Sequence, residues 1–392
     1  MKKIFLLTAI IFCLSFLLCA CADDSTNNET NINDSTNEQD NPETSEQSKL
    51  LAIKPTAYSH VSGLSLEPGS SISIIGRYAD DSFWSQVEAG ANYAVDTLNE
   101  ALGYTGNDKI KLTYSAPNNR DDVNEQINIL DEELARYPIA IGIAAIDTSA
   151  CTLQFDLASE NSIPIITVDS GSDYHRVAAH IATDNLEAAS TAASKLAHSI
   201  NETGEVAIFV QDSKSMTAEE REKGFVDKIT AEFPNISIVH IYHMDELETV
   251  AETVALEMNQ ELAADAGDVQ IDPADISQED VVAWVLKNNP NLNGIFATNL
   301  DTTQLVANVV KDLARTDLSI IGFDGGEEQL ELLENDVIDG LILQNPFGMG
   351  YATVIAAARV NTELGNDSFV NTGYVWVTKD NLSETSIANM LY

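Results

Sequence analysis

The stretch DDSFW, residues 80–84, places two carboxylates and two large aromatic rings between an apolar alternating segment and a helical pattern. Carboxylates accept hydrogen bonds and aromatic rings offer flat apolar faces. Asp81, Phe83 and Trp84 therefore have the chemistry to hold a small polar ligand. The alternative is that both rings pack under the first turn of the helix, as aromatic side chains usually do.

Further polar residues lie at or just after the carboxyl end of an apolar strand candidate. Asp169 ends IITVD, Asn299 ends GIFATN, Asp324 ends IIGFD and Gln344 ends GLILQ. Arg221 lies in TAEEREKGF, at the start of the helix that follows VAIFV. Open parallel sheets bind ligands in the crevice outside such strand ends, so we expect one site there. For Asp169, Asn299 and Asp324 the alternative is capping of the next helix, and the two roles can coincide.

The sequence lacks the motifs of catalysis and of metal binding. It has no G-x-S-x-G elbow, no phosphate loop, no G-x-G-x-x-G after the first strand and no histidine pair at metal-ligand spacing. We therefore predict no enzyme, no cofactor and no metal, although catalytic carboxylates can leave no motif. The acidic segment 258–280 is predicted to be an inserted, solvated loop. Calcium binding is the less favoured alternative, because the spacing of a calcium loop is absent.

Nine apolar strand candidates alternate with helical patterns from residue 71 onward. They cover residues 71–76, 109–114, 139–145, 164–168, 206–210, 236–242, 294–298, 318–323 and 339–343. Continuously apolar strands that alternate with helices indicate parallel sheets covered on both faces. So many strands predict an α/β fold of two doubly wound parallel-sheet lobes. Residues 51–70 show no clear pattern.

The N-terminus has the features of an export signal. Lys2 and Lys3 precede an apolar run from Ile4 to Leu18, and the run ends in LCAC. We predict a lipoprotein signal peptide over residues 1–21, with lipidation of the Cys21 thiol; a plain secretory signal is the alternative. Residues 22–50 contain no aromatic residue and are predicted to be a disordered acidic tether. The protein is then exported and anchored by lipid to the outer face of the cytoplasmic membrane, or to the periplasmic face of a membrane.

The charge of the chain excludes some classes of binding partner, and its cysteine content excludes an intrachain disulfide. The formal net charge is −42, from 62 acidic and 20 basic residues. Without a basic stripe the chain does not bind nucleic acid, and its surface does not dock on anionic lipid. Beyond the signal and Cys21 only Cys151 remains, so we expect no intrachain disulfide.

Several stretches occur in order over residues 70–385: DDSFWSQVEAGA, IPIITVDS, HIATDN, REKGF, GIFATNLDTTQLVANVV, IIGFDG, DGLILQNPFGMG and VWVTKDNLSE. Together they resemble the ribose- and galactose/glucose-binding proteins of ABC transporters, which have the type I periplasmic binding protein fold. The resemblance implies two lobes joined by three crossings, near Asp184, at Gln344–Asn345 and near Val377. The first lobe would hold residues 51–184 and 345–376, and the second 185–344 and 377–392.

The same resemblance implies a monosaccharide held between the lobes. Three carboxylates would accept hydroxyl protons, one guanidinium would donate, two amides would do both, and at least one ring would stack on a sugar face. The carboxylates are Asp81, Asp169 and Asp324, and the guanidinium is that of Arg221. The amides are Asn299 and Gln344, and the rings are Phe83 and Trp84.

The sequence departs from the family at one edge of the expected site. Ser170 stands where ribose-type members carry Arg and galactose-type members carry Asn, so a galactose- or glucose-like hexose is favoured and a pentose is the second choice. Arg176 is a candidate replacement for the missing Arg. The stacking residue of the second lobe is not identified, and Tyr242, His243 and Met244 lie in the right region.

The resemblance also implies partners. We expect a monomer that delivers its sugar to an ABC transporter permease and touches the membrane only through the lipid. The alternative is a sensor whose closed form is read by a membrane receptor or kinase. Another polyol or a nucleoside is an alternative ligand.

Overall fold

The structure is a computed structural model that describes residues 42–265, 270–360, 362 and 364–392. Residues 41–392 form one compact unit with its own hydrophobic cores. The predicted signal peptide, the lipidation of Cys21 and tether residues 22–41 lie outside the described residues. Within the described ranges, no helix combines the length and the apolar character needed to cross a membrane.

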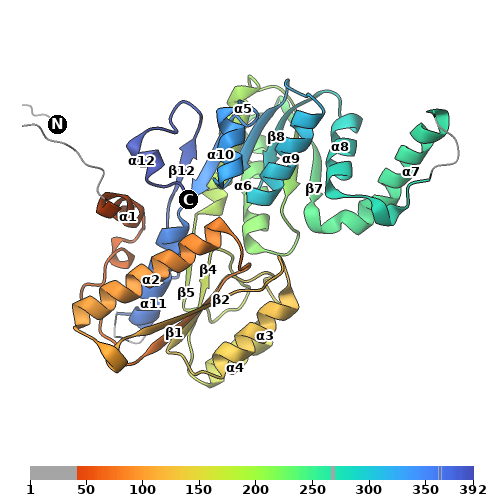
Figure 1. Cartoon of the computed structure of the whole chain (residues 1–392). Coiled ribbons are helices and arrows are strands. Elements are labelled where there is room, and N and C mark those ends of the chain that lie inside the picture. The colour runs from red at the N-terminus through yellow and green to blue at the C-terminus, as the bar shows by residue number, and fades with distance from the viewer. Residues whose placement is uncertain (1–41, 266–269, 361, 363) are drawn as a thin grey trace, which may run out of the picture. The chain divides into compact units, whose positions relative to one another are not determined.

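The first lobe is built on six parallel strands in the order β11-β5-β4-β3-β1-β2 (Figure 1). Their bounds are β1 Ser71–Ile75, β2 Lys111–Ser115, β3 Ala140–Ile143, β4 Ile165–Val168, β5 Ala179–Ala182 and β11 Phe369–Asn371. The strands β1, β3 and β4 are buried almost throughout, which explains why they are apolar at nearly every position.

The second lobe repeats this topology. Its strand order is β12-β10-β9-β8-β6-β7, so that β6 to β10 take the places of β1 to β5. The bounds are β6 Gly204–Val210, β7 Ile236–His243, β8 Leu292–Ala297, β9 Ser319–Phe323, β10 Gly340–Gln344 and β12 Tyr374–Val377. Every neighbouring pair is parallel except β10 and β12, which are antiparallel.

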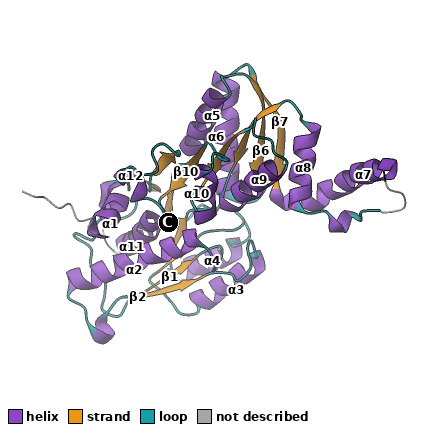
Figure 2. Ribbon diagram, turned by 45° about the horizontal axis from the view of Figure 1, so that its top comes forward, coloured by secondary structure: helices purple, strands orange, loops and turns teal. Residues whose placement is uncertain are grey.

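Helices cover both faces of each sheet (Figure 2), and the predicted α/β fold is confirmed. They are α2 Ser82–Leu102, α3 Val123–Leu134, α4 Thr152–Glu160, α5 Asn185–Ser199, α6 Met216–Glu232, α8 Gln278–Asn288, α9 Leu300–Asp312, α10 Glu327–Glu334, α11 Pro346–Val360 and α12 Thr385–Ala388. Each sheet has a buried apolar layer on either side. In the second lobe, for example, Phe209 packs toward α8 and α9 while Ile208 packs toward α5 and α6.

The helices α2 and α11 pack unusually close, side by side in both views (Figures 1 and 2). A Cβ atom at Gly90 would lie 1.9 Å from the carbonyl oxygen of Phe347, and one at Gly350 would lie 1.8 Å from that of Val87. Only glycine fits at both places. This packing carries α11, which follows a strand of the second sheet, into the core of the first lobe.

The chain passes between the lobes three times: after β5 near Asp184, at Asn345, and at Thr372–Gly373. The amide nitrogen of Asn345 donates to the carbonyl oxygens of Lys49 at 2.7 Å and Thr372 at 2.9 Å. The sequence placed the third crossing near Val377. The crossing lies earlier, at Thr372–Gly373, because β12 already pairs with β10 in the second sheet.

A helix at the start of the described chain corrects the predicted extent of the tether. Residues Pro42–Leu51 form α1, although 42–50 were predicted to be disordered. Ser45 donates to the Asn389 carbonyl oxygen at 3.4 Å, and the Asn389 amide donates to Ser48 at 3.3 Å. The contacts with Asn345 and Asn389 come from distant parts of the chain, and such contacts stabilise a short helix that composition alone does not predict.

The segment 258–280 is not a single loop, which is a second correction. Helix α7 spans Leu247–Asp265, and the Asn259 side chain exchanges two hydrogen bonds with the backbone of Ile271, at 2.7 and 3.0 Å. Ser277 then starts α8 with a capping box that includes Asp280. Residues 266–269 lie outside the described residues.

Candidate ligand-binding site between the two lobes

Strand ends of both lobes line one cavity of about 80 Å³. All eight residues predicted from the sequence lie on its wall: Asp81, Phe83, Trp84, Asp169, Arg221, Asn299, Asp324 and Gln344. An adjoining cavity of about 250 Å³ shares several of the lining residues, among them Trp84 and Asn299, and extends the space toward Met244 and Gln278. The strand-end pattern thus leads to a single place in the fold.

The start of α2 supplies one wall. Asp81 caps the helix, since its carboxylate accepts from the backbone N–H groups of Phe83 at 2.7 Å and Trp84 at 3.4 Å. The two rings meet edge to face, 5.1 Å apart, over a buried apolar patch that includes Val168 and Met349. The rings therefore pack in a core, as the alternative reading expected, and they also line the cavity.

Asp169 is a buried carboxylate without a hydrogen-bond partner among the described residues. It follows β4 with φ +56°, a left-handed conformation that few residues other than glycine adopt. Burial raises its pKa to about 6, because desolvation outweighs the attraction of Arg221 and Arg77. Asp169 does not cap a helix, because the element that follows β4 is the strand β5. The capping alternative therefore does not apply to Asp169.

Asp324 takes the equivalent place after β9 and is also left-handed, with φ +72°. It accepts from the backbone N–H of Leu300 at 3.0 Å, from the Gln344 amide at 2.7 Å and from the Tyr392 hydroxyl at 3.1 Å. Burial raises its pKa, against the opposing charge of Arg221. The other end of the Gln344 side chain, Oε1, is buried and makes no hydrogen bond within the described chain.

Arg221 is almost fully buried and fixed by two hydrogen bonds. Its Nε donates to Asn185 at 2.8 Å and its Nη1 to the Thr298 carbonyl oxygen at 2.7 Å, while the guanidinium lies 4.1 Å from the centre of the Phe323 ring. Its Nη2 has no hydrogen-bond partner among the described residues. A donor held in this way matches the hydroxyl-binding role predicted for it.

Asn299 caps α9, so the capping alternative describes one of its roles. Its Oδ1 accepts from the Thr302 N–H at 3.0 Å. The amide nitrogen makes no hydrogen bond in the described part of the protein and is left to donate elsewhere. A capping residue on the cavity wall can thus also serve a ligand.

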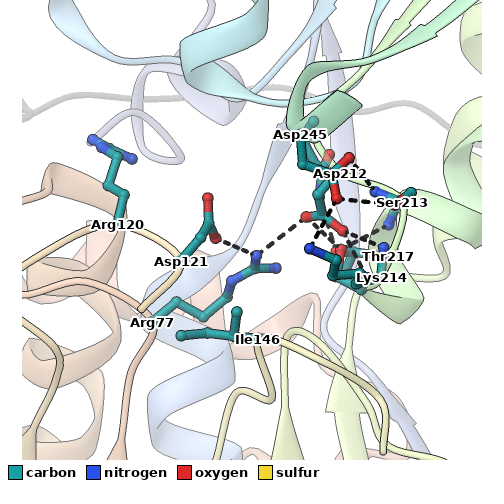
Figure 3. Close-up of polar contacts among 12 residues, drawn as sticks. Arg77, Arg120, Asp121, Ile146, Asp212, Ser213, Lys214, Thr217 and Asp245 are labelled. Carbon is teal, nitrogen blue, oxygen red and sulfur yellow. Dashed lines mark hydrogen bonds and ion pairs between the residues drawn. The ribbon is translucent and has the colours of Figure 1, made fainter. Parts of the chain in front are cut away.

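Two arginines on the wall were not predicted. Arg77 contacts Asp121 at 2.7 Å and Asp212 at 3.2 Å (Figure 3), and Arg120 contacts Asp81 at 3.1 Å. Neither arginine ends an apolar strand, which is the position at which ligand-binding side chains were expected. The signal was nevertheless present, since Arg77 and Asp212 each lie two residues after a strand end.

The weaker suggestions from the sequence had mixed outcomes. Arg176 does not replace an arginine in the site, because it donates to Ser159 at 2.8 Å on the outside of the first lobe. Of the three second-lobe candidates, Met244 lines the larger of the two cavities described above. The Tyr242 hydroxyl donates to Gln278, and His243 pairs with Glu222.

Despite its many carboxylates, the described chain contains no cluster of three or more His, Cys, Asp or Glu placed to hold a metal ion. The carboxylates of the site are instead interleaved with arginines and amides. This donor set suits an organic ligand with several hydroxyl groups.

Two sheets of one topology, three crossings and a polar, aromatic-lined cavity between the lobes define a two-lobed binding protein. Residues 72–363 match the periplasmic binding protein domain, and the chain belongs to that family. The family expected from the sequence is thereby confirmed.

Its relatives have names that concern sugars and polyols. The xylitol-binding protein of Mycolicibacterium smegmatis is 23% identical over 283 residues, covering 71% of this chain and 72% of that protein. The ribose import binding protein of Haemophilus influenzae is 25% identical over 281 residues, covering 72% and 82%. A carbohydrate transporter solute binding protein from Agrobacterium radiobacter, solved with D-arabinose, is 28% identical, with a TM-score of 0.68 over 82% of this chain and 99% of that one.

Proposed function

We propose that this protein captures a monosaccharide or a closely related polyol between its two lobes and delivers it to an ABC transporter permease. The relatives named for xylitol, ribose and D-arabinose support this class of ligand. Those relatives are binding proteins, which also favours a binding role over an enzymatic one. Closure of the lobes around the ligand is the form that a permease would read.

The observation that carries the proposal is the set of unpartnered polar groups on the cavity wall. Within the part of the chain that the structure describes, the Gln344 Oε1 is a buried acceptor without a donor. The Asp169 carboxylate and the Arg221 Nη2 belong to buried residues on the same cavity wall and make no hydrogen bond to the described residues. A buried polar group without a partner is costly, so such groups signal a missing ligand. A sugar, whose hydroxyls both donate and accept, would supply a hydrogen-bond partner to each of these three groups.

The names of the relatives cover pentoses, hexoses and a polyol, so the proposal includes five- and six-carbon ligands. A galactose- or glucose-like hexose remains the preference from the sequence. A glucose-galactose binding protein from Geobacillus stearothermophilus shares the fold, with a TM-score of 0.67 at 22% identity. We further propose that the protein acts as a monomer, exported and anchored through Cys21 to the outer face of the membrane.

The test is calorimetric titration of residues 41–392 with a panel of aldohexoses, aldopentoses, polyols and nucleosides. We expect one monosaccharide or polyol to bind tightly. Asp169→Asn should weaken that binding by about 10- to 100-fold, the value of a hydrogen bond to a charged group, since Asn keeps the shape and tolerates the left-handed backbone.

Asp173→Asn is the matched control, because Asp173 is an exposed carboxylate of the same loop. It should bind like the unmodified protein. No heat from any member of the panel, or equal binding by both variants, would contradict the proposed function.

A further inference from the structure

Two arginines of the first lobe reach across to carboxylates of the second. The Arg77 guanidinium lies 3.2 Å from Asp212 (Figure 3), and the Arg120 guanidinium lies 2.5 Å from Asp301. Arg77 follows β1 and Asp212 follows β6, which is the equivalent strand of the second sheet. The first pair therefore joins corresponding corners of the two lobes.

Each arginine also contacts a carboxylate of its own lobe. Arg77 pairs with Asp121 through the same Nη2 that reaches Asp212, and Arg120 uses its Nη2 for Asp81 and its Nη1 for Asp301. Arg120 also lies over the Tyr78 ring, 4.4 Å from its centre. These second contacts lie within the first lobe and do not join it to the second lobe.

The acceptor of the first pair is rigid. Asp212 accepts from the backbone N–H groups of Lys214 at 2.9 Å and Ser215 at 2.6 Å, and from the Ser215 hydroxyl at 2.8 Å. Burial raises its pKa, but Arg77 and these donors outweigh burial, so the pKa lies below its usual value. Asp212 is therefore charged at neutral pH and held ready to receive Arg77.

The two pairs differ in their contact with solvent. The side chains of Arg77 and Asp212 are 12% and 8% exposed, whereas those of Arg120 and Asp301 are 42% and 43% exposed. Salt screens an exposed pair much more strongly than a buried one. The Arg120–Asp301 pair should consequently give lobe closure a dependence on ionic strength, while the Arg77–Asp212 pair should keep its effect in salt.

We propose that Arg77 and Arg120 form a clasp that closes only when the two lobes meet, so that two ion pairs across the cleft retain an uncharged ligand. This inference rests on the proposed function. The arginines act as positioning residues, because they hold the lobes in the arrangement that surrounds the ligand. The clasp slows ligand release, and the release rate of an uncharged sugar thereby becomes sensitive to salt.

The variants separate contacts across the cleft from contacts within a lobe. Asp301→Asn removes an exposed carboxylate whose only ion pair among the described residues is with Arg120 across the cleft. Asp121→Asn is the matched control: this carboxylate is also exposed, also pairs with a clasp arginine and also lines the larger cavity, but it belongs to the first lobe. Neither change alters the size of the side chain.

The first measurement is the dissociation rate of the sugar identified by the panel, followed by tryptophan fluorescence at low and high salt. Asp301→Asn should raise that rate about three- to fivefold at low salt, in line with exposed ion pairs, and should reduce its salt dependence. Asp121→Asn should leave the rate within about twofold and keep the salt dependence. Equal effects of the two variants, or an unchanged rate in Asp301→Asn, would overturn the clasp.

A second measurement does not depend on a known ligand. Spin labels on Tyr137→Cys and Leu313→Cys, exposed positions on different lobes, report the distance between the lobes; Cys151 is buried and its thiol pKa is raised to about 11, so it resists labelling. In residues 41–392 at low salt, the clasp predicts a closed population that both high salt and Asp301→Asn deplete. A distance distribution that changes neither with high salt nor in Asp301→Asn would overturn the clasp. If no sugar binds while that population responds, the proposed function fails and the clasp stands.

Discussion

At the scale of single residues, the ligand-binding role proposed for Asp169 depends on the charge of its carboxylate. Its folded pKa of about 6 lies above the 3.8 of an unperturbed aspartate, so the stability it contributes is present below pH 3.8 and is lost as the pH rises through 6. The ligand-free protein therefore carries an unfavourable charge at neutral pH. A ligand that donates hydroxyl groups to this carboxylate would relieve that cost.

The first prediction follows from this charge. Sugar binding should stabilise the ionised form of Asp169 and lower its pKa, so affinity should rise as the pH increases from 5 to 7 and then level off. Titration in two buffers that differ in ionisation enthalpy should show proton release near pH 6. The groups that set this behaviour are Asp169 itself, Arg221, Arg77, Asp324 and Asp81.

Asp301 also has a pKa raised to about 6, because its partial burial and the repulsion of the nearby carboxylates outweigh the attraction of Arg120; these carboxylates belong to Asp81, Asp324 and Asp121. The variant Asp301→Asn therefore shows which of the two carboxylates releases the proton. If Asp169 is the source, this variant should still release a proton near pH 6 when sugar binds. A flat affinity between pH 5 and 7 in the unmodified protein would contradict the role of Asp169.

The second prediction concerns Tyr392. Its hydroxyl donates to Asp324 at 3.1 Å, and its ring meets Phe83 edge to face at 5.9 Å, so it contacts one predicted site residue in each lobe. Tyr392→Phe removes only the hydroxyl and should weaken sugar binding by about 3- to 10-fold, since Asp324 loses one of its fixed donors. Calorimetry with the sugar found by the panel measures this effect.

Tyr374→Phe is the control for that experiment. The Tyr374 hydroxyl has a comparable hydrogen bond, to Thr191 at 2.9 Å, but Tyr374 does not line the site. If both variants bind sugar as well as the parent, Tyr392 does not position Asp324.

At the scale of elements, two of the three crossings meet at a polar junction that no single helix or strand contains. Asn345 donates to α1 through the Lys49 carbonyl and to the β11–β12 connection through Thr372, and accepts from Gly348 in α11. Its side chain replaces backbone partners at a place where regular structure is interrupted. The junction therefore ties the second and third crossings to each other and to α1.

The third prediction tests this junction. Asn345→Ala removes a buried amide and leaves two carbonyl oxygens and one N–H without their partner, so the free energy of unfolding should fall by about 2–3 kcal/mol. Urea unfolding of residues 41–392 measures it. Asn335→Ala, at an exposed position with one local hydrogen bond, should change the free energy by less than about 0.5 kcal/mol. Similar values for the two variants would contradict the role of the junction.

Several elements could be predicted from the sequence and others could not, for physical reasons. The nine expected strands are present because buried parallel strands are apolar along their length. The strands β5, β11 and β12 were missed because they are not continuously apolar and buried: β5 contains His180, β11 ends in Asn371, and three of the four β12 residues are only half-buried. Helix α1 was missed because its stabilising contacts lie with Asn345 and Asn389, far away in the chain.

The same distinction holds for the site. Asp169 and Asp324 could be found because strand ends of a parallel sheet converge on one edge. Whether Asn299 was a cap or a site residue could not be decided from the sequence, since an asparagine between a strand end and a helix start suits both roles. The pairing of Arg77 with Asp212 depends on how two lobes meet, and Tyr392 reaches the site from the end of the chain, so neither leaves a local pattern.

At the scale of the whole molecule, one topology is used twice, and the site lies where the carboxyl ends of the two copies come together. Asp169 and Asp324 take equivalent places in the two lobes, as do Arg77 and Asp212. The first two residues belong to the ligand cavity, and the second two join the lobes directly. The proposed ligand site and the ion pair between the lobes thus occupy equivalent positions of one duplicated topology.

The central claim is that a sugar lies between the lobes on these residues, and a crystal structure of residues 41–392 with the sugar selected by the panel tests it most directly. The account predicts sugar hydroxyls within hydrogen-bond distance of the Asp169 carboxylate and the Gln344 Oε1, and a sugar face against Trp84 or Phe83. A sugar bound elsewhere, with Asp169 still without a partner, would contradict the account.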